Sequence, residues 1–246
     1  MLPTLLTDTV SADPRRALDS ALLWGFEAVV LRTVGRQRVP HVNEAQLRRL
    51  LEDAEMPLEA VDPGLFEGDA TAPAAGLDDL EALAALAPFC TRMRTRTVIV
   101  GPMGAAPREV SQASGVLKRA GDVAAGYGLT LAVRNEGEAA SAEALADLVG
   151  SIGHPSVVGW WSVAASREAG EEPLASAKAL VGTPLAGIEA DEAFAEAAPE
   201  ASGLIPLCQA GFEGPVVLAF GGVPQKGLAT ATALIRHVRM ARKAAA

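Results

Sequence analysis

Charged side chains gather directly after a short apolar stretch in the middle of the chain. Leu129–Val133 is almost entirely apolar, and Arg134, Asn135 and Glu136 follow it at once. An apolar run between a glycine and a charged cluster is typical of a strand that is buried on both faces. In parallel α/β folds, ligands bind at the carboxyl ends of the strands. We therefore expect Arg134, Asn135 and Glu136 to lie on the floor of a ligand-binding site.

Two roles suit Arg134. It could form a salt bridge at the rim with Glu136, Glu138 or Glu189, or its planar guanidinium could bind a carboxylate or phosphate group of a ligand. If an ion pair forms, we expect Glu189 as the first partner and Asp62 as the second, since both follow apolar runs of their own.

Other strand ends carry further candidates. Glu189 and Asp62 are the candidate catalytic residues, because a carboxylate at a strand end can act as a general base, although paired rim charges fit the same pattern. Arg32 is a third strand-end charge and a candidate for ligand binding. Trp160 and Trp161 are adjacent, so one should point into the fold and one outward. The inward ring could stack on a sugar or simply fill the core.

The apolar runs that carry these residues recur along the whole chain. They alternate with helical segments at the spacing of βαβ units, which predicts a parallel sheet. Eight such repeats without a domain break predict a single (β/α)8 barrel of the α/β class over residues 1–246. Neither a G-x-G-x-x-G motif nor a P-loop occurs. The predicted strands are Leu2–Thr7, Phe26–Leu31, Pro57–Val61, Thr97–Val100, Leu129–Val133, Ser156–Trp161, Leu185–Ile188 and Val216–Phe220.

Local signals mark several boundaries. Asp13 before Pro14 predicts a helix start, Gly25 predicts the end of that helix, and Asn43 predicts the next start. The segment Pro63–Gly76, rich in Gly, Pro and Ala, is the longest predicted loop. It could be a mobile lid over the site or a disordered surface connection.

Composition excludes several classes of protein. The net charge of −9 argues against a nucleic-acid partner, because phosphate binding needs a concentrated basic surface. No apolar run is long enough to cross a membrane, and the N-terminus lacks the basic region of a signal peptide. Cys90 and Cys208 are isolated, which predicts no disulfide. We therefore expect a cytoplasmic protein with no membrane partner.

The order of these segments resembles the xylose isomerase-like barrels, the sugar-phosphate isomerase/epimerase superfamily that also includes the endonuclease IV type. The resemblance rests on Gly25–Leu31, Gly128–Val133, His154–Gly159 and Gly211–Val217, and it covers nearly the whole chain. It implies a (β/α)8 barrel and an isomerase or epimerase activity on a sugar or sugar phosphate.

The resemblance also implies a metal site, which this sequence does not match. Members of that family usually hold a divalent metal with Glu, Asp, His and Glu at successive strand ends. A guanidinium offers only donors and would repel such a cation, which needs converging oxygen or imidazole ligands. We therefore expect no bound metal and no cofactor. The family's first Glu falls on Arg134, its Asp on Ser162 or Val163, and the companion His of that Asp on Ala165 or Ser166. The seventh-strand His falls on or near Glu189, and the final Glu falls on Ala219. Asn135 matches the family's usual Asn.

Three functions remain open at this point. The first is a sugar or sugar-phosphate isomerase or epimerase with a degenerate, metal-free site and a sugar-like or anionic ligand. The second is a non-catalytic barrel that binds a ligand or a partner protein. The third, DNA repair of the endonuclease IV type, is disfavoured by the acidic composition and the missing ligands. The sequence does not indicate an oligomeric state.

Overall fold

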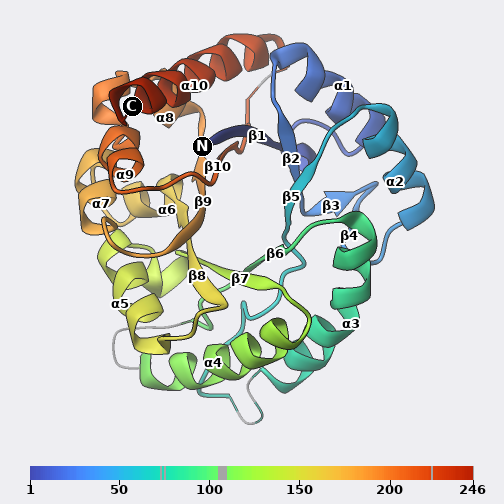
Figure 1. Cartoon of the computed structure of the whole chain (residues 1–246), viewed down its shortest axis with the longest axis vertical. Coiled ribbons are helices and arrows are strands. Elements are labelled where there is room, and N and C mark those ends of the chain that lie inside the picture. Colours follow the sequence, from blue (N-terminus) through green and yellow to red (C-terminus); the bar gives the residue numbers. More distant parts are fainter. Residues whose placement is uncertain (73, 75, 105–109, 223, 246) are drawn as a thin grey trace.

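Eight parallel strands close into a barrel in the computed structural model of the chain (Figure 1). The structure describes residues 1–246 except 73, 75, 105–109, 223 and 246. Neighbouring strands follow the order β1-β10-β9-β8-β7-β6-β5-β2, and β2 pairs again with β1. The predicted (β/α)8 barrel is confirmed. The barrel strands are β1 (Leu2–Leu6), β2 (Ala28–Leu31), β5 (Leu58–Val61), β6 (Thr97–Val100), β7 (Thr130–Arg134), β8 (Val157–Ser162), β9 (Leu185–Ala190) and β10 (Pro215–Leu218).

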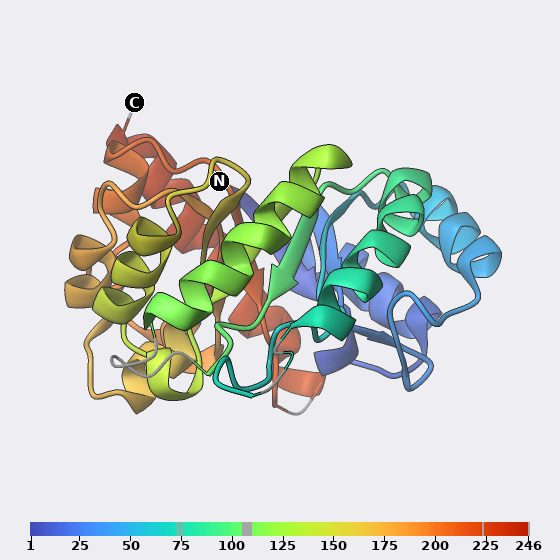
Figure 2. The same ribbon diagram turned by 90° about the horizontal axis from the view of Figure 1, so that it is seen from below.

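The first and last strands complete the closure. Leu2 lies opposite Pro215 and Leu5 lies opposite Leu218, while Thr4 faces Ala28 on the other side of β1. Because all eight strands run in one direction, their carboxyl ends form a single rim. We call this rim, with the loops that directly follow the strands, the mouth. Both chain termini lie at the opposite end of the barrel (Figure 2).

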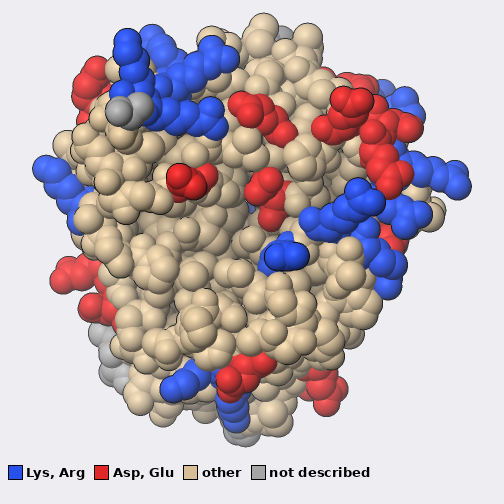
Figure 3. Space-filling view, viewed as in Figure 1, with Lys and Arg blue, Asp and Glu red and all other residues tan. Residues whose placement is uncertain are grey.

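Helices surround the strands on the outside (Figure 1). Asp13 caps α1 ahead of Pro14, Gly25 ends that helix at φ 83°, and Asn43 caps α2, as predicted. Lys and Arg side chains gather over the C-terminal end of α10, on the face opposite the mouth (Figure 3). The helices are α1 (Pro14–Trp24), α2 (Glu44–Asp53), α3 (Leu77–Met93), α4 (Val110–Gly126), α5 (Ala142–Ile152), α6 (Val163–Glu168), α7 (Pro173–Ala179), α8 (Glu192–Glu196), α9 (Leu204–Gln209) and α10 (Pro224–Ala245).

The core has two layers, as the alternation of side chains along a strand requires. A large outer cluster joins strand residues such as Leu5 and Val29 to helix residues such as Leu86. A small separate cluster takes the alternate strand positions and fills the barrel itself. Its buried members are Leu6, Val30, Ala60, Ile99, Ala132, Trp160 and Val217.

Some elements were not predicted. A two-stranded hairpin, β3 (Thr33–Val34) with β4 (Gln37–Arg38), follows β2. The helices α6 and α8 are too short to show a helical period in the sequence. Within the described ranges, no helix combines the length and the apolar character that a membrane crossing requires.

The predicted loop Pro63–Gly76 is anchored to the end of β6 in its first half. Phe66 is fully buried, and its carbonyl accepts the backbone N–H of Met103 at 2.9 Å. The carbonyl of Leu65 likewise accepts the N–H of Gly101 at 2.8 Å. The disordered-connection interpretation is therefore wrong for this half, because an apolar anchor and sheet-like hydrogen bonds hold it. Residues 73 and 75 lie outside the described residues.

Candidate functional site

The predicted site residues of three strands meet at the mouth. Asp62 directly follows β5, Arg134 is the last residue of β7, and Glu189 lies near the end of β9. Their positions follow from the parallel direction of the strands, which brings every carboxyl end to the same rim. The charges that follow the apolar runs in the sequence therefore share one site.

Arg134 is the centre of an ion-pair network. Its Nη1 lies 2.7 Å from Oδ2 of Asp62, and its Nε and Nη2 lie 2.9 and 2.8 Å from Oε2 of Glu136. Only 12% of the Arg134 side chain is exposed. Burial alone would lower the pKa of Arg134, but the negative charges of Asp62, Glu189 and Glu136 outweigh burial and raise it. The mouth therefore contains a permanent, largely desolvated cation.

Asp62 holds two guanidinium groups at once. Its Oδ1 lies 2.7 Å from Nη2 of Arg38 and accepts the backbone N–H of Gly64 at 3.2 Å, while its Oδ2 pairs with Arg134. Burial would raise the pKa of Asp62, but the charges of Arg134 and Arg38 outweigh burial and lower it. A carboxylate with both oxygens paired and a lowered pKa is poorly suited to be a general base. The geometry thus makes Asp62 an anchor for the two arginines and does not support the catalytic role predicted for it.

The predicted order of ion-pair partners for Arg134 was wrong. Asp62, the second choice, forms the pair, while Glu189 makes no ion pair within 4.0 Å among the described residues. Both acidic residues stand two strands from Arg134, so strand spacing did not separate them. The guanidinium extends toward β5, where Glu67 from the following loop adds a further carboxylate at 3.9 Å.

Glu189 is a carboxyl group deep in the mouth. It is partly accessible, yet burial raises its pKa, and the charges of Arg134 and Arg32 offset only part of that effect. The neighbouring residues Ile188 and Ala190 belong to the outer cluster, so the side chain of Glu189 points to the barrel interior. A carboxyl group with a raised pKa at a ligand-facing position is a candidate for proton transfer.

Trp160 and Trp161 point to opposite sides of β8, as predicted. Trp160 belongs to the barrel interior, whereas the indole N–H of Trp161 donates to Oγ of Ser166 in the outer layer. Both rings are fully buried. Trp161 thus faces the helices and Trp160 fills the barrel interior, the core-filling alternative left open by the sequence, and a stacking role on a ligand stays a prediction. The indole N–H of Trp160 has no hydrogen-bond acceptor among the described groups.

Gly187 gives Trp160 its place in the barrel. A Cβ atom at Gly187 would lie 2.2 Å from the indole ring of Trp160, so only glycine leaves room for the ring there. The indole N–H of Trp160 weakly favours the ionised form of Glu189, although less than burial opposes that form, and it does not reach normal hydrogen-bond geometry with the carboxylate. Trp160 thus fills the floor beneath Glu189.

Asn135, a predicted ligand-binding residue, makes its side-chain hydrogen bonds within the protein. It is fully buried, and its side-chain oxygen accepts the backbone N–H of Ser162 at 2.6 Å. Its amide nitrogen donates to the carbonyls of Ala140 and Ser162 and lies 3.2 Å from Oγ of Ser166. Both polar atoms of the Asn135 side chain are thereby engaged in joining β7 to β8 and α6.

Arg32 lies at the mouth as predicted but is already paired. Its Nε and Nη2 donate to the two carboxylate oxygens of Asp8 at 2.9 and 3.2 Å, and Thr33 donates to the same carboxylate. Asp8 and Arg38 were both missed by the sequence analysis. Asp8 follows the first predicted strand, which was an available signal. Arg38 lies on the hairpin, which has no apolar pattern to reveal it.

The residues present do not fit the divalent metal that the resemblance implied. Among the described residues, no three His, Cys, Asp or Glu side chains converge on one point. The positions at the end of β8 serve the fold, since Ser162 caps α6 and Ser166 bonds to Asn135. The guanidinium of Arg134 stands among the carboxylates where a cation would be held. His154 contacts Asp122 instead, away from the mouth.

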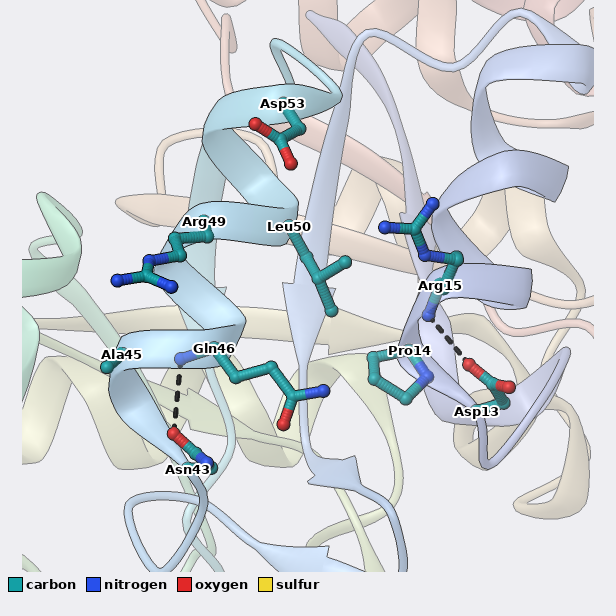
Figure 4. A pocket seen from close by; sticks show the side chains of 9 residues that line it. All are labelled: Asp13, Pro14, Arg15, Asn43, Ala45, Gln46, Arg49, Leu50 and Asp53. Atoms are coloured by element: carbon teal, nitrogen blue, oxygen red, sulfur yellow. Dashed lines mark hydrogen bonds between the residues drawn. The ribbon is translucent and has the colours of Figure 1, made fainter.

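A groove of about 740 Å³ lies on the outside of the barrel, between α1 and α2 (Figure 4). Gln46 and Leu50 of α2 and Pro14 of α1 line it, together with the capping residues Asp13 and Asn43. None of the predicted site residues lines this groove. The side chains of Asp13 and Asn43 already accept backbone N–H groups at the starts of α1 and α2, so these two side chains are not free to bind a ligand in the groove.

Comparisons with known proteins reveal no relative by sequence. No protein-family model matches the chain, and no curated protein sequence matches it. Many solved structures do match it in shape.

The structural matches extend over the whole chain. An L-ribulose 3-epimerase superposes with a TM-score of 0.78 at 12% identity, covering 99% of this chain and 95% of the other. A xylose isomerase domain protein from Alicyclobacillus acidocaldarius subsp. acidocaldarius gives 0.73 at 18% identity, with 98% and 99% covered. The IOLI protein, solved with a zinc atom, gives 0.78 at 15% identity, with 98% and 99% covered. At these identities the likeness establishes a shared fold.

Proposed function

We propose that this chain, whose fold is that of xylose isomerase-like barrels and sugar epimerases, is a sugar isomerase-like protein that works without a bound divalent metal. Proteins of this shape include an L-ribulose 3-epimerase and a D-allulose 3-epimerase solved with D-allulose. The observation that carries the proposal is a guanidinium group at a strand end where the family would have a metal ligand. It belongs to Arg134, the last residue of β7, and lies 2.7 Å from the carboxylate of Asp62. The isolated thiols Cys90 and Cys208 suit a reducing, cytoplasmic setting.

Arg134 supplies the positive charge in this proposal. Isomerisation beside a carbonyl group creates negative charge on the carbonyl oxygen when the neighbouring carbon loses a proton. A fixed cation in a site of low dielectric stabilises such a developing charge without reorganising. Asp62 and Glu136 hold the guanidinium in place, which provides the preorganisation.

Glu189 moves the proton. Its carboxylate takes the proton from the carbon beside the carbonyl group, and the electron pair of that C–H bond forms the C=C bond of an enediolate as the carbonyl oxygen becomes negative. The proton of the neighbouring hydroxyl group passes to that oxygen, and the carboxyl group of Glu189 returns its proton to the former carbonyl carbon, so that the former hydroxyl oxygen becomes the new carbonyl oxygen. Burial raises the pKa of Glu189, which makes its carboxylate a stronger base toward carbon than an exposed carboxylate. One carboxyl group on one face of the substrate is sufficient for aldose–ketose isomerisation. Glu189 points to the barrel interior and makes no ion pair among the described residues, whereas Glu192, also without an ion pair, accepts the backbone N–H of Gly221; a single free interior carboxyl group favours isomerisation over epimerisation.

The test is hydrogen exchange with solvent. Purified protein treated with a chelator is incubated with ketoses and aldoses in D2O, and deuterium incorporation at carbon is followed by NMR. We expect incorporation to persist in the chelator, to be lost in Glu189→Gln, and to remain in Glu196→Gln, an exposed control on α8. Exchange that requires an added divalent metal would contradict the proposal.

A non-catalytic sugar-binding barrel is the second candidate. It is favoured by the carboxylates that already neutralise Arg134, since they reduce the positive charge left to stabilise a developing anion. Saturable sugar binding without any deuterium incorporation would identify this function.

A further inference from the structure

We infer that the ligand of the mouth carries no phosphate or carboxylate group, because the chain's own carboxylates occupy the groups that would bind one. This inference rests on the proposed function and narrows its substrate class to uncharged polyhydroxy compounds. It replaces the anionic ligand that the sequence left open. The contacts of the arginines, the glycine loop after β10 and the balance of charge each support it.

Four arginines at the rim of the mouth are engaged within the protein. Arg32 donates two hydrogen bonds to the carboxylate of Asp8, at 2.9 and 3.2 Å. Arg167 is paired with Asp191, which follows β9. Arg134 and Arg38 share Asp62, as described above. A planar guanidinium binds a ligand's anion best through two parallel hydrogen bonds. Arg32 already uses that geometry on Asp8, and Arg38, Arg134 and Arg167 each have at least one guanidinium nitrogen paired with a carboxylate of the protein.

A carboxylate of the protein also occupies the loop after β10, the eighth barrel strand. In (β/α)8 barrels the loops after the seventh and eighth strands, with a nearby helix N-terminus, frequently bind phosphate. Here Oε1 of Glu192 accepts the backbone N–H of Gly221 at 2.9 Å. A Cβ atom at Gly222 would lie 2.5 Å from Oε2 of Glu192, so the carboxylate lies directly against the loop. Glu192 therefore takes the place of a phosphate.

The charge balance of the mouth agrees with these contacts. Carboxylates outnumber guanidinium groups among its described side chains, so an entering anion meets an excess of negative charge. An uncharged ligand meets carboxylate oxygens that can accept its hydroxyl groups. The carboxylates are Asp8, Asp62, Glu67, Glu136, Glu189, Asp191 and Glu192, and the guanidinium groups are Arg32, Arg38, Arg134 and Arg167.

Calorimetric titration with inorganic phosphate tests the role of Glu192. We expect weak phosphate binding to the unchanged protein and binding at least about tenfold tighter in Glu192→Ala, which uncovers the Gly221 N–H. Glu196→Ala removes the same charge from the same helix without touching the loop, so its phosphate binding should match the unchanged protein. Glu192→Gln keeps the shape of the side chain and should lie between the two, which guards against misfolding of the alanine variant. Equal phosphate binding by Glu192→Ala and Glu196→Ala would overturn the role of Glu192.

A second titration separates this inference from the proposed function. D-allulose and its 6-phosphate are compared on the unchanged protein, with the free sugar expected to bind more tightly. Tighter binding of the 6-phosphate would overturn the inference and leave a sugar-binding function standing. Failure of every free sugar to bind would count against the proposed function, while the phosphate comparison between the two glutamate variants would still decide the role of Glu192.

Discussion

Removing the carboxylate of Asp62, which Arg134 and Arg38 share, should lower the free energy of unfolding. Asp62→Ala leaves Arg134, whose side chain is 12% exposed, with Glu136 as its close partner, and leaves Arg38 with Glu67. Deleting one partner of a buried ion pair costs about 3–5 kcal/mol, because an uncompensated charge stays buried. Since Glu136 still neutralises part of the Arg134 charge, we expect the lower end, about 3 kcal/mol. For a chain of this length that corresponds to a fall in Tm of about 6–12 °C.

The diagnostic measurement compares Asp62→Ala with the double variant Asp62→Ala/Arg134→Met in urea at pH 7. The double variant removes the stranded cation, so it should be more stable than Asp62→Ala by about 1–2 kcal/mol. Glu44→Ala is the matched control: Glu44 pairs with Arg92 at 2.6 Å, but both side chains are partly exposed, and the loss should be about 1 kcal/mol or less. A double variant no more stable than Asp62→Ala would refute the reasoning.

Three further outcomes follow from buried groups. Burial raises the pKa of Glu189, so the folded state retains a proton that the unfolded state releases, and the free energy of unfolding should fall as pH rises from the unfolded pKa toward the folded pKa. The variant Glu189→Gln should flatten this slope and add about 1 kcal/mol to the free energy of unfolding at pH 8. Urea unfolding at a series of pH values measures both effects. Burial lowers the pKa of His237, whose Nδ1 has no described partner, so the free energy of unfolding should fall as pH drops below about 6.5. The variant His237→Leu should not show this loss when unfolding is compared at pH 7.5 and pH 5.5. Gly187→Ala should cost about 1–3 kcal/mol by pressing on Trp160, whereas Gly150→Ala, with open space around its Cβ, should be neutral or stabilising; equal Tm values for the two variants would contradict the packing argument.

The sequence predicted the barrel because its signals are local. A buried parallel strand is a short apolar run, and a helix start is a capping side chain such as Asp13 or Asn43, so each repeat is readable by itself. Once eight repeats are counted, parallel closure gathers the strand-end charges without any further information. That is why Asp62, Arg134 and Glu189 were correctly placed on one rim.

The partners within the site could not be predicted in the same way. Arg38 reaches Asp62 from a hairpin of two-residue strands, which leaves no periodic pattern in the sequence. Asn135 follows a strand like its charged neighbours, yet it points to the outer layer and bonds to Ser162 and Ser166. Which way a side chain turns after a strand ends depends on tertiary contacts, and the order of residues does not contain them.

The pairing of β1 with β10 has a consequence for how the chain folds during synthesis. The strand β1 leaves the ribosome before every other barrel strand, but β10, which pairs Pro215 with Leu2, is the last barrel strand to emerge. Until then one edge of β1 stays unpaired, and unpaired strand edges promote aggregation of folding intermediates. Contacts between such distant segments also slow the final step. Truncations that remove β10 should therefore leave an open, aggregation-prone sheet, and full-length chains should gain resistance to proteases late, when the last repeat docks.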